Sequence, residues 1–145
     1  MQAFILDLEN RPGSWADTAE KIAEKGVNLL VCGVTGDGHG YVGMVTSDDA
    51  STREALDEIR CKYREFEVLP LSLEHVPGTS AKLARMLSNA GINIELFMPT
   101  GESGGQTVVA LGVDRIDDAR RILGNQVLSD HGSLWPKAVA RTATR

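Results

Sequence analysis

The feature that most constrains this chain is a long internal repeat. The segment LENRPGS at residues 8–14 returns as LEHVPGT at residues 73–79, and GVN at 26–28 returns as GIN at 91–93. Pro12 and Pro77 are 65 residues apart, and the same offset relates the two glycine-to-asparagine steps without a gap. Such self-similarity indicates the duplication of one folding unit. The 145 residues are therefore predicted to form two modules, 1–69 and 70–129, followed by a tail, 130–145, that we expect to be partly disordered.

The first copy predicts a strand, a turn and a helix in succession. Apolar residues alternate from position 4 to position 8, which indicates a strand with one buried face. Pro12 ends that strand and favours a helix beginning near Ser14, whose side chain is predicted to form a capping box with Asp17. Gly26 is expected to end the helix in a left-handed conformation.

The remaining pattern predicts a β-α-β-β-α-β order in each module, the α+β arrangement called ferredoxin-like. A strand over 27–35 is expected to be buried on much of both faces, followed by a hairpin at 36–40 and a helix capped by Asp48 or Asp49. Pro70 is expected to separate a closing strand, 66–69, from the next opening strand, 71–74. In the second copy we expect a helix from 79 to 90, a strand over 93–98, a loop at 101–105 and a short last strand near 126–128.

The predicted helices carry apolar faces that define the expected core. Ala55, Leu56, Ile59 and Tyr63 are assigned to one face in the first module, and Leu83, Ala84, Leu87 and Ala90 to one face in the second. The tail contains Leu134-Trp135, which is expected to dock on the body.

Composition narrows the classes of partner. A formal net charge of −5 argues against nucleic acid, because binding phosphates relies on concentrated Lys and Arg. No apolar run approaches the ~20 residues that span a bilayer, so no membrane contact is expected. Two isolated cysteines without a secretory signal favour a cytoplasmic location.

A ligand site is suggested by the geometry of the repeated turn. A strand that ends in Pro-Gly and opens a helix presents unpaired backbone N–H groups at the positive end of the helix, which suits a carboxylate. Asn28 and Asn93 each offer an amide donor and acceptor that suit a free amino acid. Taken singly, these residues also fit a purely structural role, with Pro-Gly making the turn.

At these residues the sequence resembles the ACT domain, the regulatory amino-acid-binding module of aspartokinases and D-3-phosphoglycerate dehydrogenase. The resemblance covers nearly all of residues 3–128 as two modules in tandem. It implies that Asn10 and Asn28, and in the second copy His75 and Asn93, contact a bound amino acid. The family also has a ligand-contacting His two residues before the turn Asn, where this chain has Leu8 and Leu73, which argues against serine as the ligand.

The resemblance further implies an effector held at a seam between modules, with the first turn of one module facing the second strand of its mate. Arg11 is a candidate to steer an anion, or else a solvated surface charge. The resulting ligand-binding candidates are Asn10, Arg11, Gly13, Ser14, Asn28, Leu29, His75, Val76, Gly78, Thr79, Asn93 and Ile94. No catalytic residue, metal or cofactor is predicted, and the expected partners are a free amino acid or similar metabolite, a second copy, or a partner enzyme.

Other functions fit the sequence less well. An enzyme lacks parts, because the three histidines are scattered and neither a metal-ligand spacing nor a Ser-His-Asp arrangement occurs. An RNA-binding sheet would need aromatic pairs on its central strands, but Tyr41 has no aromatic partner two residues away and 106–113 has no aromatic residue. A copper carrier would need a pair of thiols in the first loop, and residues 10–14 contain no cysteine. The remaining alternative is a regulatory subunit or modulator whose modules contact proteins and bind no small ligand.

Overall fold

The computed structural model describes residues 1–129 together with Leu134 and Trp135. It divides into two compact units, with the division between Phe66 and Glu67, and each unit is described by itself. The remaining residues of the predicted tail lie outside the described residues. Leu134 is buried, in agreement with its expected docking.

Unit 1 is an antiparallel sheet with two helices. Its elements are β1 (Gln2–Glu9), α1 (Ser14–Glu24), β2 (Leu29–Gly36), β3 (His39–Thr46), α2 (Asp49–Glu58) and the first part of β4 (Lys62–Glu74). The strand order is β2-β3-β1-β4, which together with the βαββαβ succession is the ferredoxin-like arrangement. The predicted α+β fold class is therefore confirmed.

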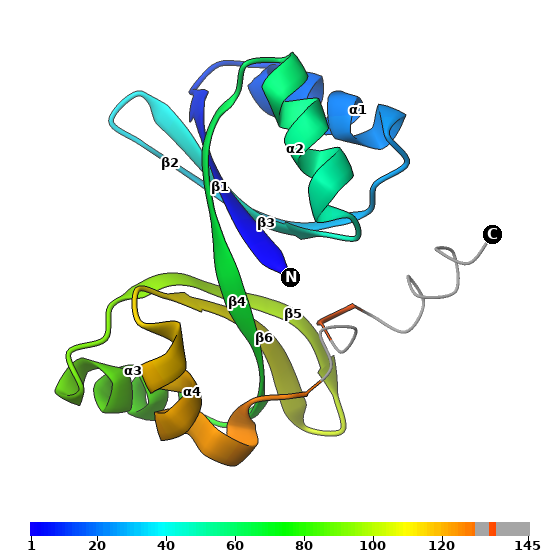
Figure 1. The fold of residues 1–145 in the computed structure, drawn as a ribbon. Helices are drawn as coiled ribbons and strands as arrows, with labels where there is room; N and C mark the ends of the chain where they lie inside the picture. The colour runs from blue at the N-terminus through cyan, green and yellow to red at the C-terminus, as the bar shows by residue number, and fades with distance from the viewer. Residues whose placement is uncertain (130–133, 136–145) are drawn as a thin grey trace. The chain divides into compact units, whose positions relative to one another are not determined.

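The core of unit 1 lies between the sheet and its helices, and Figure 1 shows α1 and α2 together on one side of the strands. Phe4 pairs with Met44 across β1 and β3, and Leu6 pairs with Val42, so that these side chains share one face. They form a cluster with Ile22 and Leu56 from the helices. The alternation of apolar residues in the first strand thus does position the core.

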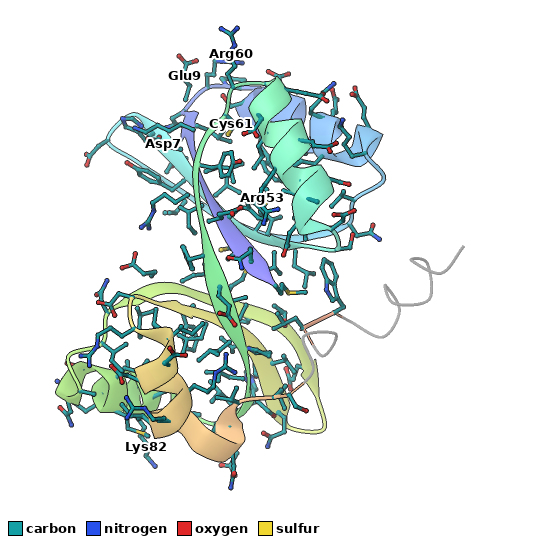
Figure 2. All side chains as sticks on the ribbon, in the orientation of Figure 1. Asp7, Glu9, Arg53, Arg60, Cys61 and Lys82 are labelled. Carbon is teal, nitrogen blue, oxygen red and sulfur yellow. The ribbon has the colours of Figure 1, made fainter. Side chains whose placement is uncertain are left out.

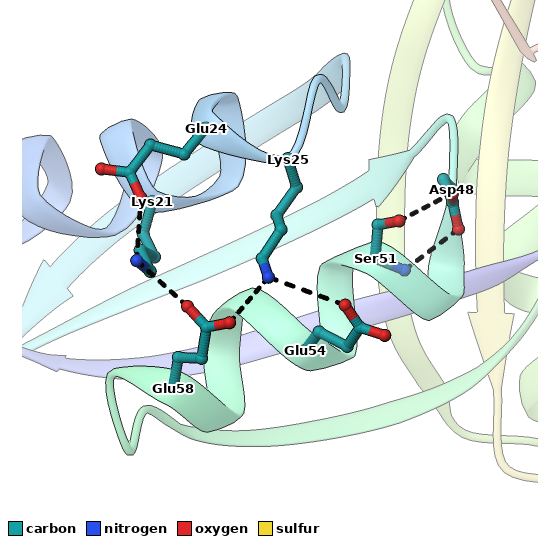
Figure 3. Close-up of polar contacts among 7 residues, drawn as sticks. All are labelled: Lys21, Glu24, Lys25, Asp48, Ser51, Glu54 and Glu58. Carbon is teal, nitrogen blue, oxygen red and sulfur yellow. Dashed lines mark hydrogen bonds and ion pairs between the residues drawn. The ribbon is translucent and has the colours of Figure 1, made fainter.

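Charged side chains link the two helices on their outer surfaces (Figure 3). Lys25 Nζ lies 2.6 Å from Glu58 Oε1 and 3.6 Å from Glu54 Oε2. Lys21 Nζ lies 2.8 Å from Glu24 Oε2 and 3.0 Å from Glu58 Oε2. Glu58 therefore contacts Lys21 of α1 and Lys25, the C-cap residue of that helix, and links α2 to α1.

The helix ends differ in part from the prediction. Gly13, not Ser14, is the N-cap of α1, and no side chain caps the helix, so the predicted capping box is wrong. Asp17 contacts Arg11 instead, at 3.4 Å. Gly26 has φ 70°, as expected of a left-handed stop. Asp48 caps α2 as predicted, because its Oδ1 accepts a hydrogen bond from the Ser51 amide at 3.1 Å.

The hairpin between β2 and β3 was predicted correctly, but the predicted burial of β2 is wrong. Asp37 and Gly38 both have positive φ and join two strands in register, as in a two-residue hairpin. The strand β2 is exposed from Val31 to Gly36, so the expectation that it is buried on both faces is wrong. It is the edge of the sheet in the strand order, and its apolar composition misled the prediction because β-branched residues also suit an edge.

One helix face was also misassigned in each unit. Ala55 and Leu56 are buried, but Ile59 is the C-cap of α2 and is 39% exposed, while Tyr63 belongs to β4. In the second unit Leu83 and Leu87 are buried as predicted, whereas Ala84 is exposed and Ala90 only half-buried. Alanine contributes too little surface to fix the inward direction of a helix.

Unit 2 repeats most of the pattern. It continues β4 and adds α3 (Thr79–Asn89), β5 (Ile94–Ser103), β6 (Gln106–Val113), α4 (Ile116–Leu123) and a 3₁₀ turn, η1 (Gly124–Gln126). Its strand order is β4-β6-β5, and its core gathers Leu71, Leu87 and Leu111 with their neighbours. The predicted loop at 101–105 is shorter than expected, because β5 extends to Ser103 and only Gly104 and Gly105 form the turn.

Pro70 does not end a strand, and the predicted break between 66–69 and 71–74 is wrong. It lies within the continuous β4 and pairs with Ala110 of β6. Its carbonyl accepts a hydrogen bond from the Leu128 amide at 2.8 Å. Since the N and O of a strand residue point to the same side, its missing N–H faces away from β6 and costs that ladder no bond. The predicted last strand near 126–128 is reduced to one bridge, between Leu71 and Val127.

Candidate functional site

The Pro-Gly turn has the same conformation in both units. Gly13 has φ 89° and Gly78 has φ 93°, and each is the left-handed N-cap of the helix that follows. L-residues with a side chain rarely adopt this conformation, so glycine is what allows the strand to enter the helix here. The repeated Pro-Gly therefore encodes one repeated turn.

In both units the turn is held to the hairpin that follows the second strand of the unit. The Asn10 amide donates to the Gly38 carbonyl at 3.3 Å, and the His75 amide donates to the Gly105 carbonyl at 2.9 Å. In unit 1 an additional contact binds the hairpin to β1, since His39 Nδ1 lies 2.7 Å from Asp7 Oδ1. Figure 2 shows Asp7 and Glu9 near the end of β1 that leads into the turn. The hydrogen bond between His39 and Asp7 lowers the pKa of Asp7, which keeps the carboxylate charged.

The first turn of each helix offers backbone N–H groups. Within the part of the chain that the structure describes, the amides of Trp15 and Ala16 find no acceptor, and no side chain caps α1. On α3, the amides of Ser80 and Ala81 likewise find no acceptor among the described residues, and no side chain caps the helix. Free N–H groups at the positive end of a helix favour an anion.

A pocket of about 460 Å³ adjoins the turn in unit 1. Asn10, Arg11, Ser14 and Trp15 line one side, and five successive residues of β2, Val31 to Thr35, line another. Trp15 packs partly on the core of the unit. Consecutive residues of one strand point to alternate faces, so this pocket follows the exposed edge of β2.

A larger pocket, of about 660 Å³, adjoins the equivalent turn in unit 2. Its floor is formed by Leu73, Phe97 and Val109, one from each strand of the unit. His75, Val76, Gly78 and Thr79 line the turn side, while Glu74, Glu102 and Thr107 supply further polar groups. Both pockets have the size of ordinary small-molecule sites.

Arg11 is engaged by its own neighbours. Its Nε lies 3.0 Å from Glu9 Oε2 and its Nη2 3.4 Å from Asp17 Oδ2. The hydrogen bonds to Glu9 and then Asp17 raise the pKa of the guanidinium, which stays charged. Its positive charge is thus already balanced by two carboxylates, and at 53% side-chain exposure it remains in solvent.

His75 bridges two strands of unit 2 from the turn. Its Nδ1 lies 2.8 Å from Thr107 Oγ1 on β6, and its Nε2 lies 4.0 Å from Glu102 Oε2 on β5. The imidazole therefore fixes the turn against the two strands that form the opposite wall.

Asn28 and Asn93, the candidates that follow the helices, do not lie at the Pro-Gly turns. Asn10 follows β1 where Glu9 pairs with His39, whereas Asn28 precedes β2 where Leu29 pairs with Thr46. Positions 39 and 46 of β3 are separated by roughly 24 Å at strand spacing. Asn28 therefore lies at the opposite end of the sheet of its unit from Asn10.

Asn93 occupies the corresponding place in unit 2. Its amide donates to Asp114 Oδ1 at 2.9 Å, and its Nδ2 donates to Glu95 Oε1 at 2.8 Å. The candidates that do not line either pocket are Gly13, Asn28, Leu29, Asn93 and Ile94. The structure thus brings together Asn10, Arg11 and Ser14 in one pocket and His75, Val76, Gly78 and Thr79 in the other.

Sequence reasoning did not single out the strand residues of the pockets. Phe97 and Pro99 lie two positions apart on β5, and Thr107 and Val109 two positions apart on β6, so each pair lies on the face of the pocket; the register of β5 shifts after Pro99, and Glu102 then pairs with Thr107. Their spacing of two positions, which indicates residues on one face of a strand, was present in the sequence and could have identified them. It was missed because β5 was predicted to end at residue 98.

Two negative findings apply to the described residues. None of their helices is long and apolar enough to cross a membrane. Nor does the described part of the chain place three or more His, Cys, Asp or Glu side chains where they would hold a metal ion.

Comparison with solved structures identifies the fold. A protein from Bacteroides thetaiotaomicron, BT0572, superposes with a TM-score of 0.74 at 23% identity, over 88% of this chain and 90% of that chain. The ligand-free regulatory subunit of aspartate kinase from Thermus thermophilus gives 0.61 at 18% identity, over 86% and 90%. The regulatory subunit from Thermus flavus gives 0.59 at 20% identity, over 84% and 86%.

Comparison of sequences adds no closer relative, since no protein-family model and no curated protein matches the chain. The structural matches nevertheless extend over both repeats and nearly the whole of the matched chains. The chain therefore has the fold of the ACT-domain proteins, the class to which the aspartate kinase regulatory subunits belong.

Proposed function

We propose that this chain is a regulatory protein that binds a free amino acid or a closely similar metabolite at its Pro-Gly turns. The observation that carries the proposal is the coincidence, twice in one chain, of a pocket with the uncapped first turn of a helix.

The chemistry of the turns suits a zwitterion. The carboxylate of the ligand would accept hydrogen bonds from the free amides of the first helical turn, where the helix dipole favours negative charge. Its ammonium would lie toward the acidic residues beside the turn, Glu9 in unit 1 and Glu74 or Glu102 in unit 2. Gly13 and Gly78 leave the main chain accessible, since nothing but the Arg11 guanidinium lies within 4 Å of a Cβ added at either of them.

The asparagines of the second strands would complete the site only across modules. Within one unit Asn10 and Asn28 lie at opposite ends of the sheet, so a ligand that contacts both kinds of residue has to take them from two copies of the module. We propose that the effector lies at such a junction, with Asn28-Leu29 or Asn93-Ile94 contributed by the partner module.

A regulatory role is supported by the class of the matched structures, two of which are regulatory subunits of aspartate kinases. Regulation would act on a separate partner enzyme or on self-association. A ligand shifts either equilibrium only by the difference in its affinity for the two states.

The test is ligand-induced stabilisation in a thermal-shift screen of the common free amino acids. A ligand at 100 times its dissociation constant should add about 2.7 kcal/mol to the free energy of unfolding. Asn10→Ala should abolish the shift of the ligand that binds the turn of unit 1, and Asn28→Ala the shift of the ligand at the turn to which Asn28 is contributed across the module junction. Asn89→Ala is the matched control, because Asn89 is exposed at the end of α3 and lines neither pocket.

A modulator that only contacts proteins is the second candidate, favoured by the exposed edge strand β2. It predicts no stabilisation by any amino acid at millimolar concentration. It also predicts that Asn10→Ala leaves association with the partner unchanged.

A further inference from the structure

The two pockets differ in what they would accept. Position 15 in unit 1 corresponds to position 80 in unit 2 by the repeat offset, and there Trp15 is replaced by Ser80. Both residues line the pockets of their units. The unit with the serine has the larger pocket, about 660 Å³ against about 460 Å³. The smaller side chain at this wall of unit 2 agrees with the direction of that difference.

The interior of the unit 2 pocket is apolar. Leu73 and Val109 are 4% and 1% exposed and belong to the core of the unit, and Phe97 packs on the same cluster. At the turn, Val76 stands where unit 1 has Arg11. Arg11, whose charge is balanced by two carboxylates, is thus replaced in unit 2 by an apolar residue. Val76 is 55% exposed.

The charged groups of this pocket are acidic. Glu74 and Glu102 line it, and none of the described Lys or Arg side chains does. His75, the remaining titratable group of the lining, contacts Thr107 and lies 4.0 Å from Glu102. An anionic side chain in the ligand would meet two carboxylates without a lysine or arginine partner, while a cationic one would have to lie on an apolar floor.

We infer that the pocket of unit 2 selects an amino acid with a large, uncharged, apolar side chain, and that Ser80 sets its size. This inference rests on the proposed function, because it assumes that the pocket holds an amino acid. The ligand side chain would lie on Leu73, Phe97 and Val109, beside Ser80. Its ammonium would face Glu74 and Glu102.

The experiment is calorimetric titration of the full chain carrying Asn10→Ala, which should not bind at the turn of unit 1, with leucine, phenylalanine, aspartate and lysine as separate probes. Leucine or phenylalanine should bind at least tenfold more tightly than aspartate and lysine. Ser80→Trp should weaken binding of the apolar probe at least tenfold, since it restores the side chain found in unit 1. Ser88→Trp is the matched control, because Ser88 is exposed on the same helix and lines no pocket, and it should leave binding unchanged.

The outcomes separate the two claims. Preferential binding of aspartate or lysine, or apolar binding that Ser80→Trp leaves intact, overturns the selectivity inferred for unit 2 while amino-acid binding stands. Binding of none of the common amino acids at millimolar concentration overturns the proposed function itself. The ranking of the four probes on the Asn10→Ala chain decides the selectivity even if Ser80→Trp does not fold.

Discussion

At the scale of the residue, Gly13 and Gly78 are the positions on which the site depends. The sequence predicted a Pro-Gly turn between strand and helix at both positions, but not the left-handed conformation that the two glycines adopt as N-caps. The role of Ser14 was not predictable, since a serine before a helix fits a cap equally well. It became the first helical residue because the left-handed glycine had already turned the chain.

Replacing Gly13 by alanine is expected to destabilise the chain by about 1–2 kcal/mol, the cost of a left-handed L-residue. The strain is conformational, because the added Cβ would lie 3.6 Å from Arg11 Nη1, an ordinary contact. Urea denaturation measures the change in the free energy of unfolding. Gly36→Ala is the control: its φ is not in the left-handed region, its surroundings are open, and it should not destabilise. Equal effects of the two substitutions would contradict the strain assigned to the turn.

At the scale of the element, the periodicity of apolar residues predicted the helices and most strands. The errors concern a proline read as a strand break and the burial of one strand. Pro70 was taken as a break, yet its missing N–H faces away from β6, so β4 passes through it. The apolar run of β2 looked buried, because exposure depends on which strand is at the edge of the sheet, a non-local property. Ion pairs between the helices were likewise beyond prediction, since they join residues far apart in the sequence, as in Lys25 and Glu58, which are 33 positions apart.

The pairing of Glu58 with Lys25 and Lys21 should make stability depend on pH. The hydrogen bonds from Lys25 and then Lys21 lower the pKa of Glu58 below its ordinary value of 4.5. Because the pKa is lower in the folded state, the contribution is present above 4.5 and is lost as the pH falls through the lowered pKa. Urea denaturation at pH 7 and pH 3 should therefore show a smaller acid-induced loss for Glu58→Gln than for the unmodified chain.

Glu20→Gln is the matched control for this element, since Glu20 is an exposed carboxylate of α1 with no ion pair among the described residues. It should lose stability between the two pH values as the unmodified chain does. The same dependence in Glu58→Gln would show that the helix pair contributes nothing to the acid sensitivity. Added salt should reduce the Glu58 effect, because these groups are partly exposed.

At the scale of the whole molecule, one unit has been duplicated and its copies have diverged at the site. The duplication was predictable from the offset of the repeat, and the matched structures extend over both copies. The divergence was visible in the sequence as Asn10 against His75 and Trp15 against Ser80. The effect of this divergence on the size of the pocket could not be predicted, because the size depends on which side chains of β5 and β6 face the turn.

The most direct test of amino-acid binding at the turns is a titration followed by the backbone amide signals in ¹H–¹⁵N NMR spectra. With an amino acid that stabilises the chain, the account predicts saturable shifts of the amides that begin the helices, those of Trp15 and Ala16 or of Ser80 and Ala81, together with the glycine before them. Saturable shifts confined to other elements, with these amides unmoved, would contradict it.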